Sequence, residues 1–251
     1  FALHLARSAA MAGNAVAVYS LEMQGERLAD RWLAAASNIN PYRWRNGIPT
    51  SQEMENAHTA ASELSGLPIY VDDSTSVSMD HIRSSARLLK SRNQCDAIII
   101  DYLQLCDMAT KQPTATANRK WHKPPGSQVA GQGAAYSVVL LSQLNRDAEN
   151  RPGGVRNWHT CGESGAIEQD ADVVLFLYRA AYYNSQNGET EQANENEAEC
   201  IVAKNRHGET SVVRPCWDGA HTRFSNLDEI HEQTDADNSL QNPVNTMEQT
   251  L

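Results

Sequence analysis

Several features that mark particular protein classes are missing from this sequence of 251 residues. Its five cysteines are scattered, with no C-x-x-C pair, so the sequence predicts neither a zinc site nor a disulfide framework. No apolar run reaches the length of a membrane span. Together with the sparse cysteines, this predicts a cytoplasmic protein that does not contact membranes.

Positive charge is also scarce. Lysine and arginine number 21 against 31 acidic residues, which gives a net charge of −10. A global basic surface for nucleic acid is therefore excluded, and any such contact must be confined to a few loops. Hydrophobic residues make up 41% of the chain, enough for one α/β core or two small ones.

The most informative stretch is Ala97–Leu105, where an unbroken apolar run leads into Asp101. Such a run predicts a strand buried on both faces, which is typical of a central parallel strand. A carboxylate at the C-terminal end of such a strand lies where open α/β sheets bind their ligands.

Helical and strand-like segments alternate along the rest of the chain. We expect helices over 1–12, 25–37, 51–64 and 78–92, and strands over 15–20, 68–72, 138–142, 172–177 and 199–203. Pro41 is expected to break the chain after the second helix. This alternation predicts an α/β fold: a doubly wound, mostly parallel sheet with helices on both faces. Residues 1–227 form the predicted core, and 228–251 an acidic, disordered tail.

Polar side chains follow three of the predicted strands: Glu22, Asp101 and Gln143. Hydrolysis of a nucleoside triphosphate needs a carboxylate for a metal ion, a group that orients water and a cation for the developing charge. The three strand-end residues fit the first two needs. Lys204 and Arg206, expected just after the last core strand, fit the third.

Five motifs resemble one known family. They are S-L-E-M (residues 20–23), I-D-Y-L-Q-L (100–105), L-S-Q-L-N-R (141–146), E-S-G-A-I-E-Q-D-A-D (163–172) and K-N-R-H-G (204–208). In this order, over residues 1–227, they resemble the C-terminal motor domain of DnaB-type replicative helicases. The resemblance implies a RecA-like ATPase that uses ATP and Mg²⁺ and moves along single-stranded DNA as a ring, expected to be a hexamer. Primase and a helicase loader are further expected partners.

The resemblance also implies roles for single residues. Glu22 is the catalytic glutamate, Asp101 the Mg²⁺ carboxylate and Gln143 the sensor of the γ-phosphate. Lys204 and Arg206 would reach into the neighbouring subunit's site. Glu163, Ser164, Gly165 and Arg146 would contact single-stranded DNA, largely through backbone amides in the case of the 163–165 loop.

The sequence departs from the family pattern at three places. The phosphate-binding loop G-x-x-x-x-G-K-[ST] is absent, so we expect the printed chain to be a fragment that begins just after it and hydrolyses negligible ATP. Gly162 stands where the family has a basic residue. Residues 120–136 contain two adjacent prolines and three glycines and are predicted to be irregular instead of helical.

Back-translation with a shifted reading frame restores family-like residues at the last two places, which favours compensating frameshifts. Two alternatives to the helicase motor stay open at this point. One is a decayed, non-catalytic RecA-like interaction module, and the other is a related ATPase of the RadA or KaiC kind.

Overall fold

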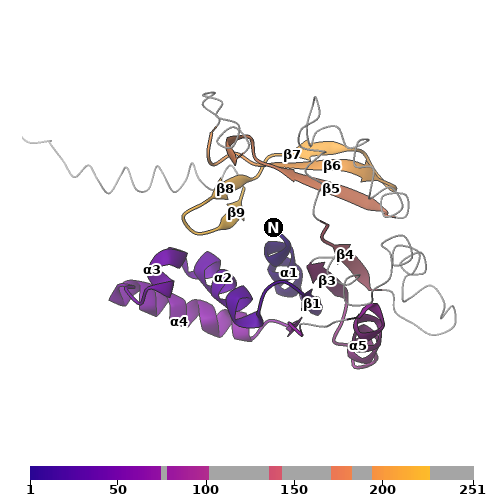
Figure 1. Cartoon of the computed structure of the whole chain (residues 1–251), viewed down its shortest axis with the longest axis horizontal. Coiled ribbons are helices and arrows are strands. Elements are labelled where there is room, and N and C mark those ends of the chain that lie inside the picture. The colour runs from indigo at the N-terminus through magenta and orange to yellow at the C-terminus, as the bar shows by residue number, and fades with distance from the viewer. Residues whose placement is uncertain (75–77, 102–135, 143–170, 183–193, 227–251) are drawn as a thin grey trace, which may run out of the picture.

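A four-stranded parallel sheet lies at the centre of the protein (Figure 1). The computed structural model describes residues 1–74, 78–101, 136–142, 171–182 and 194–226. The strands of the central sheet are β1 (Val16–Ser20), β2 (Ile69–Asp72), β3 (Ala97–Asp101) and β4 (Ser137–Leu140), in the order β2-β1-β3-β4. All three pairings are parallel, as the sequence predicted.

Helices cover both faces of this sheet. They are α1 (Ala2–Met11), α2 (Gly25–Ser37), α3 (Pro41–Arg45), α4 (Ser51–Ser65) and α5 (Met79–Ser91). Side chains of β1 and β3 alternate between the faces: Tyr19 and Ile98 pack with α5, whereas Val18 and Ile99 pack with α1 and α2. Every residue of β1 is buried, as expected for a strand covered on both faces. The predicted doubly wound α/β fold is therefore confirmed.

Local sequence signals account for several helix ends. Thr50 and Glu53 form a reciprocal capping box at the start of α4, and the Ser78 hydroxyl accepts the His81 N–H at the start of α5. Helix α2 ends at Ser37, ahead of the predicted break at Pro41. This proline instead occupies the first turn of α3, where its missing N–H costs nothing.

The C-terminal strands differ from the sequence-based expectation. Strands β5 (Val173–Tyr178), β6 (Glu199–Asn205) and β7 (Ser211–Val213) form a separate antiparallel sheet, and β8 (Cys216–Asp218) pairs with β9 (Arg223–Ser225) in a hairpin. The short connection 206–210 allows β6 and β7 only an antiparallel pairing. Alternate residues of β5 are exposed, unlike those of β1, which is typical of a sheet with one open face.

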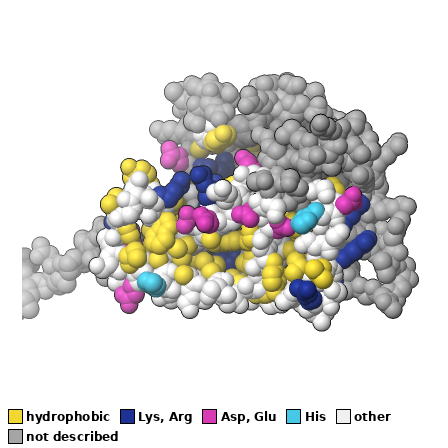
Figure 2. All heavy atoms as spheres, turned by 60° about the horizontal axis from the view of Figure 1, so that its bottom comes forward, with side chains coloured by type: hydrophobic (Ala, Val, Ile, Leu, Met, Phe, Trp, Pro, Cys, Tyr) yellow, Lys and Arg dark blue, Asp and Glu magenta, His cyan; other side chains and the backbone are white. Residues whose placement is uncertain are grey.

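On the side of the molecule that carries α4 and α5, exposed apolar side chains lie among charged ones (Figure 2). Met54 of α4 and Leu88 of α5 are among these exposed hydrophobic residues, and single ones of this kind are normal on a protein surface. Across the described ranges, no helix combines the length and the apolar character needed to cross a membrane. Apart from Tyr136, the predicted irregular segment 120–136 lies outside the described residues, as does the predicted tail 228–251.

Candidate nucleotide site

Two acidic residues named from the sequence meet at the carboxyl edge of the central sheet. Strands β1 and β3 are neighbours, with Ser20 opposite Asp101. Beyond the last residue of β1, the Leu21 N–H donates to the Asp101 carbonyl oxygen at 2.8 Å. Glu22 is the next residue along the chain, so both carboxylates lie at the same end of adjacent strands, as predicted.

A serine fixes the turn that carries Glu22. The Ser20 side chain is buried, and its Oγ donates to the Met23 carbonyl oxygen at 2.7 Å and accepts the Met23 N–H at 3.3 Å. These bonds close a short loop around Leu21 and Glu22 and set the direction in which the chain leaves β1. Glu22 itself is exposed, as a group that acts on a bound ligand must be.

The electrostatic surroundings of Asp101 favour a bound cation. Burial raises the pKa of this carboxyl, the negative charge of Glu22 raises it further, and Arg31 of α2 acts in the opposite direction. An ionised Asp101 is therefore destabilised by desolvation and like-charge repulsion, which a cation relieves. Carboxylate oxygens are the protein ligands that Mg²⁺ prefers, usually one or two of them with phosphate and water completing the shell. Asp101 fits that need.

The two predicted cations lie on the antiparallel sheet. Strand β6 is longer than expected, so that Lys204 lies within it, opposite Val174, and not after its end. Arg206 directly follows β6 and forms an ion pair with Asp172 of the same chain, with 2.6 Å between Nη1 and Oδ1. The Arg206 N–H also donates to the Asp172 carbonyl oxygen at 2.8 Å. Gln143, Arg146 and the 163–165 loop lie outside the described residues.

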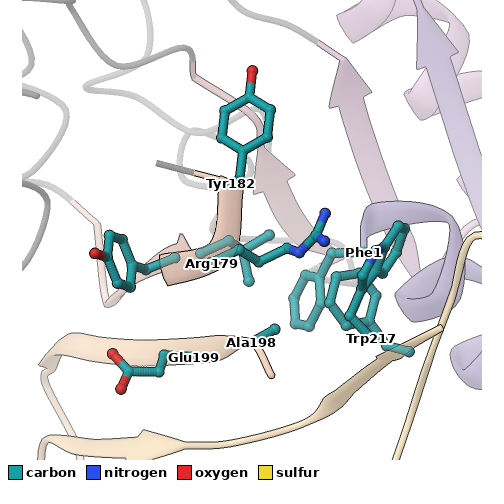
Figure 3. A pocket seen from close by; sticks show the side chains of 9 residues that line it. Phe1, Arg179, Tyr182, Ala198, Glu199 and Trp217 are labelled. Atoms are coloured by element: carbon teal, nitrogen blue, oxygen red, sulfur yellow. The ribbon is translucent and has the colours of Figure 1, made fainter. Parts of the chain in front are cut away.

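Sequence reasoning missed an aromatic cavity next to the start of α1. It has a volume of about 310 Å³ and lies between Phe1, the end of β5 and the β8–β9 hairpin. The lining residues include Phe1, Arg179, Tyr182, Glu199, Trp217 and Phe224. The guanidinium of Arg179 reaches toward the rings of Phe1 and Trp217, whereas Tyr182 and Glu199 point away from them (Figure 3).

The rings in this cavity contact one another closely. Phe224 packs edge-on against Phe1 with 5.7 Å between ring centroids and lies tilted on Trp217 at 4.7 Å. The Arg179 Cζ lies 4.8 Å from the centroid of the Trp217 ring, a cation–π distance. Its Nε is buried and has no hydrogen-bond partner among the described residues. A planar ligand with a polar edge suits such a site.

Comparison with known proteins places this geometry in a family. Residues 1–226 match the family described as the DnaB-like helicase C terminal domain. The chain belongs to this family. The predicted resemblance is thereby confirmed, and the central sheet with its helices is the RecA-like ATPase domain of a DnaB-like helicase.

Individual relatives agree with this assignment. The chain is 34% identical to the replicative DNA helicase DnaB of Geobacillus stearothermophilus and 35% identical to the replicative DNA helicase DnaC of Bacillus subtilis, covering 91% of this chain in each case. The chain spans about half of the length of these relatives, 49% in both cases.

Solved structures share the fold. A helicase-like ATPase domain solved on its own superimposes with a TM-score of 0.77 at 29% identity, covering 90% of this chain and 79% of that domain. A DnaB-like replicative helicase, solved to describe its interactions with primase, gives the same TM-score and identity over 90% of this chain and 54% of its own.

Proposed function

We propose that this chain is the ATP-hydrolysing motor of a ring-forming replicative DNA helicase that moves along single-stranded DNA and unwinds duplex. The observation that carries this proposal is the meeting of Glu22 and Asp101 on adjacent parallel strands, held by the 2.8 Å bond from Leu21 N–H to the Asp101 carbonyl. Family membership and the helicase names of the relatives support it.

Each carboxylate has one role in this proposal. Asp101 binds Mg²⁺, which neutralises charge on the phosphates of ATP. Glu22, exposed and held by the Ser20 turn, orients and deprotonates the attacking water. Gln143, which follows β4, senses the γ-phosphate. The half-buried setting of Asp101 excludes part of the bulk water, and this strengthens its interaction with a cation.

The aromatic cavity would accept the base of the nucleotide. Phe1 immediately precedes α1, and the phosphate-binding loop of the family stands just ahead of the matching residue. A base attached to phosphates at that helix end therefore lies within reach of Trp217 and Arg179. Stacking on an aromatic face and a guanidinium plane suits any purine, and the buried Nε of Arg179 offers a donor for its polar edge.

The remaining predicted residues act between subunits or on DNA. In a ring, Lys204 and Arg206 would stabilise the transition state in the neighbouring site, as an arginine finger does. The 163–165 loop, with Arg146, would contact the DNA backbone in the central channel, a mode that tolerates a net charge of −10. The relative described with primase makes primase an expected partner, and a helicase loader is another.

The test compares the printed chain with the same chain joined to an upstream G-x-x-x-x-G-K-T segment. We expect negligible ATP turnover from the first, and DNA-stimulated turnover with duplex unwinding from the second. Glu22→Gln should abolish the turnover of the extended chain, whereas the control Glu26→Gln, an exposed glutamate four residues on, should leave it within about twofold.

Two results would contradict the proposal. One is measurable turnover by the printed chain, and the other is turnover that survives Glu22→Gln. A folded extended chain that binds no nucleotide would instead favour the alternative of a non-catalytic interaction module.

A further inference from the structure

A histidine of α1 holds the outer edge of the β8–β9 hairpin. Trp217 and Phe224 are paired residues of the two strands, and the Phe224 N–H is directed away from β8. It donates to Nε2 of His4 at 3.3 Å. Backbone N–H groups alternate in direction along an antiparallel strand, so an edge strand leaves such donors without a partner in its own ladder. His4 supplies the missing acceptor from a helix 220 positions away in the sequence.

The charge state of His4 suits this role. Burial lowers the pKa of its imidazole to about 4, and the nearby positive charges of the Phe1 amino group, Arg7 and Arg223 act in the same direction. The ring is therefore neutral at physiological pH. A neutral imidazole that carries its proton on Nδ1 accepts at Nε2, which a charged one cannot do.

From His4, an unbroken series of contacts leads into the cavity. The His4 ring lies edge-on to Phe224 with 5.9 Å between centroids, Phe224 lies on Trp217, and Trp217 carries the Arg179 guanidinium. Displacement of Phe224 would thus alter the surface on which a planar ligand stacks. The hairpin joins the start of α1 to the end of β5 through these side chains (Figures 1 and 3).

We propose that His4 is a positioning residue for nucleotide binding: by accepting the Phe224 N–H, it fixes the aromatic wall of the cavity relative to the helix that follows the phosphate site. The inference rests on the proposed assignment of the cavity to the base. His4 itself does not line the cavity and acts through Phe224.

The rest of the hairpin does not depend on His4. Strand β8 is anchored separately, because the Trp217 N–H donates to the Asn196 carbonyl at 2.6 Å and the Ala198 N–H to the Pro215 carbonyl at 3.2 Å. Loss of the His4 acceptor should therefore loosen β9 and Phe224 while β8 stays in place. A variant at position 4 is expected to fold and to bind the base more weakly.

The experiment measures binding of adenosine to the printed chain by equilibrium dialysis, with ribose as the base-free comparison. Adenosine needs no phosphate-binding loop, so the cavity is tested alone. His4→Leu removes the acceptor and should weaken adenosine binding about fivefold, the effect of one neutral hydrogen bond. His4→Gln keeps an acceptor at similar reach and should stay within about twofold. Trp217→Ala should abolish binding.

The outcomes separate the two ideas. If Trp217→Ala binds adenosine normally, or the unaltered chain shows no saturable binding, the base-site assignment fails. If Trp217→Ala loses binding but His4→Leu keeps it, only the role of His4 is overturned. Equal losses in His4→Leu and His4→Gln would also overturn it, because the acceptor would then be irrelevant. A pH series adds a readout that packing alone would not change: affinity should be constant above about pH 6 and fall toward pH 4, where His4 gains its proton.

Discussion

Replacing Ser20 with alanine tests the link between strand β1 and the position of Glu22. The Ser20 hydroxyl makes two bonds to the backbone of Met23, at 2.7 and 3.3 Å, from a side chain that is only 1% exposed. Ser20→Ala removes both bonds without changing the fold-determining pattern of β1. It leaves the Met23 N–H and carbonyl to find water beside a half-buried residue.

The magnitude follows from these two bonds. One neutral hydrogen bond contributes about 1 kcal/mol net, and an unpaired buried group costs about 1–3 kcal/mol. Since Met23 is partly exposed and the longer bond is weak, we expect a loss of about 1–2 kcal/mol in the free energy of unfolding, or roughly 3–6 °C in Tm. Urea unfolding with an unchanged m-value measures the first quantity.

Activity should fall further than stability. Glu22 belongs to the loop that Ser20 closes, and misplacement of a catalytic group by about 1 Å costs about a hundredfold in rate. ATP turnover by the extended chain should therefore drop at least about tenfold under conditions where the variant is fully folded.

Ser37→Ala is the matched control. Ser37 is also buried, and its Oγ donates to the Leu33 carbonyl at 2.6 Å, but within α2 and away from the strand ends. Its removal should cost less than about 1 kcal/mol and leave turnover unchanged, since the Leu33 carbonyl lies in a helical turn with its own N–H partner. Equal loss of turnover in both variants, or none in Ser20→Ala, would refute the reasoning.

Other parts of the molecule give three more predictions. Ile98→Ala, at a fully buried position between β3 and α5, should cost about 2–5 kcal/mol in urea unfolding, against less than about 0.5 kcal/mol for the exposed control Leu88→Ala. Extended chains carrying Arg206→Ala should be inactive alone but regain turnover when mixed with Glu22→Gln chains, whereas no recovery at any ratio would show that Arg206 does not act across subunits. The depressed pKa of His4 contributes stability that is fully present above about pH 6.5 and lost as the pH falls through about 4; after discounting for partial exposure, about 1–2 kcal/mol should disappear over that window, and His4→Gln should remove this dependence.

The half of the site built by the central sheet was predictable because its signals are local. The apolar run of β3 ends at Asp101 and that of β1 just before Glu22, and parallel strands bring their carboxyl ends to one edge whatever the loops do. Capping residues such as Thr50 mark helix starts within four positions of the chain. Each of these inferences needed only the pattern of one segment and a general rule for assembling parallel strands.

The aromatic cavity could not be predicted on the same grounds, because it exists only through contacts between distant segments. Phe1, Arg179 and Phe224 carry no motif in their own neighbourhoods, and β8 and β9 are three-residue strands too short for any periodicity to reveal. The ion pair between Arg206 and Asp172 likewise joins two motifs whose spacing in the sequence gives no sign of contact. In this protein the strand-end rule locates the phosphate chemistry, whereas the site for the base depends on how a C-terminal hairpin meets the first helix, and the bond from Phe224 to His4 is the contact that sets this meeting.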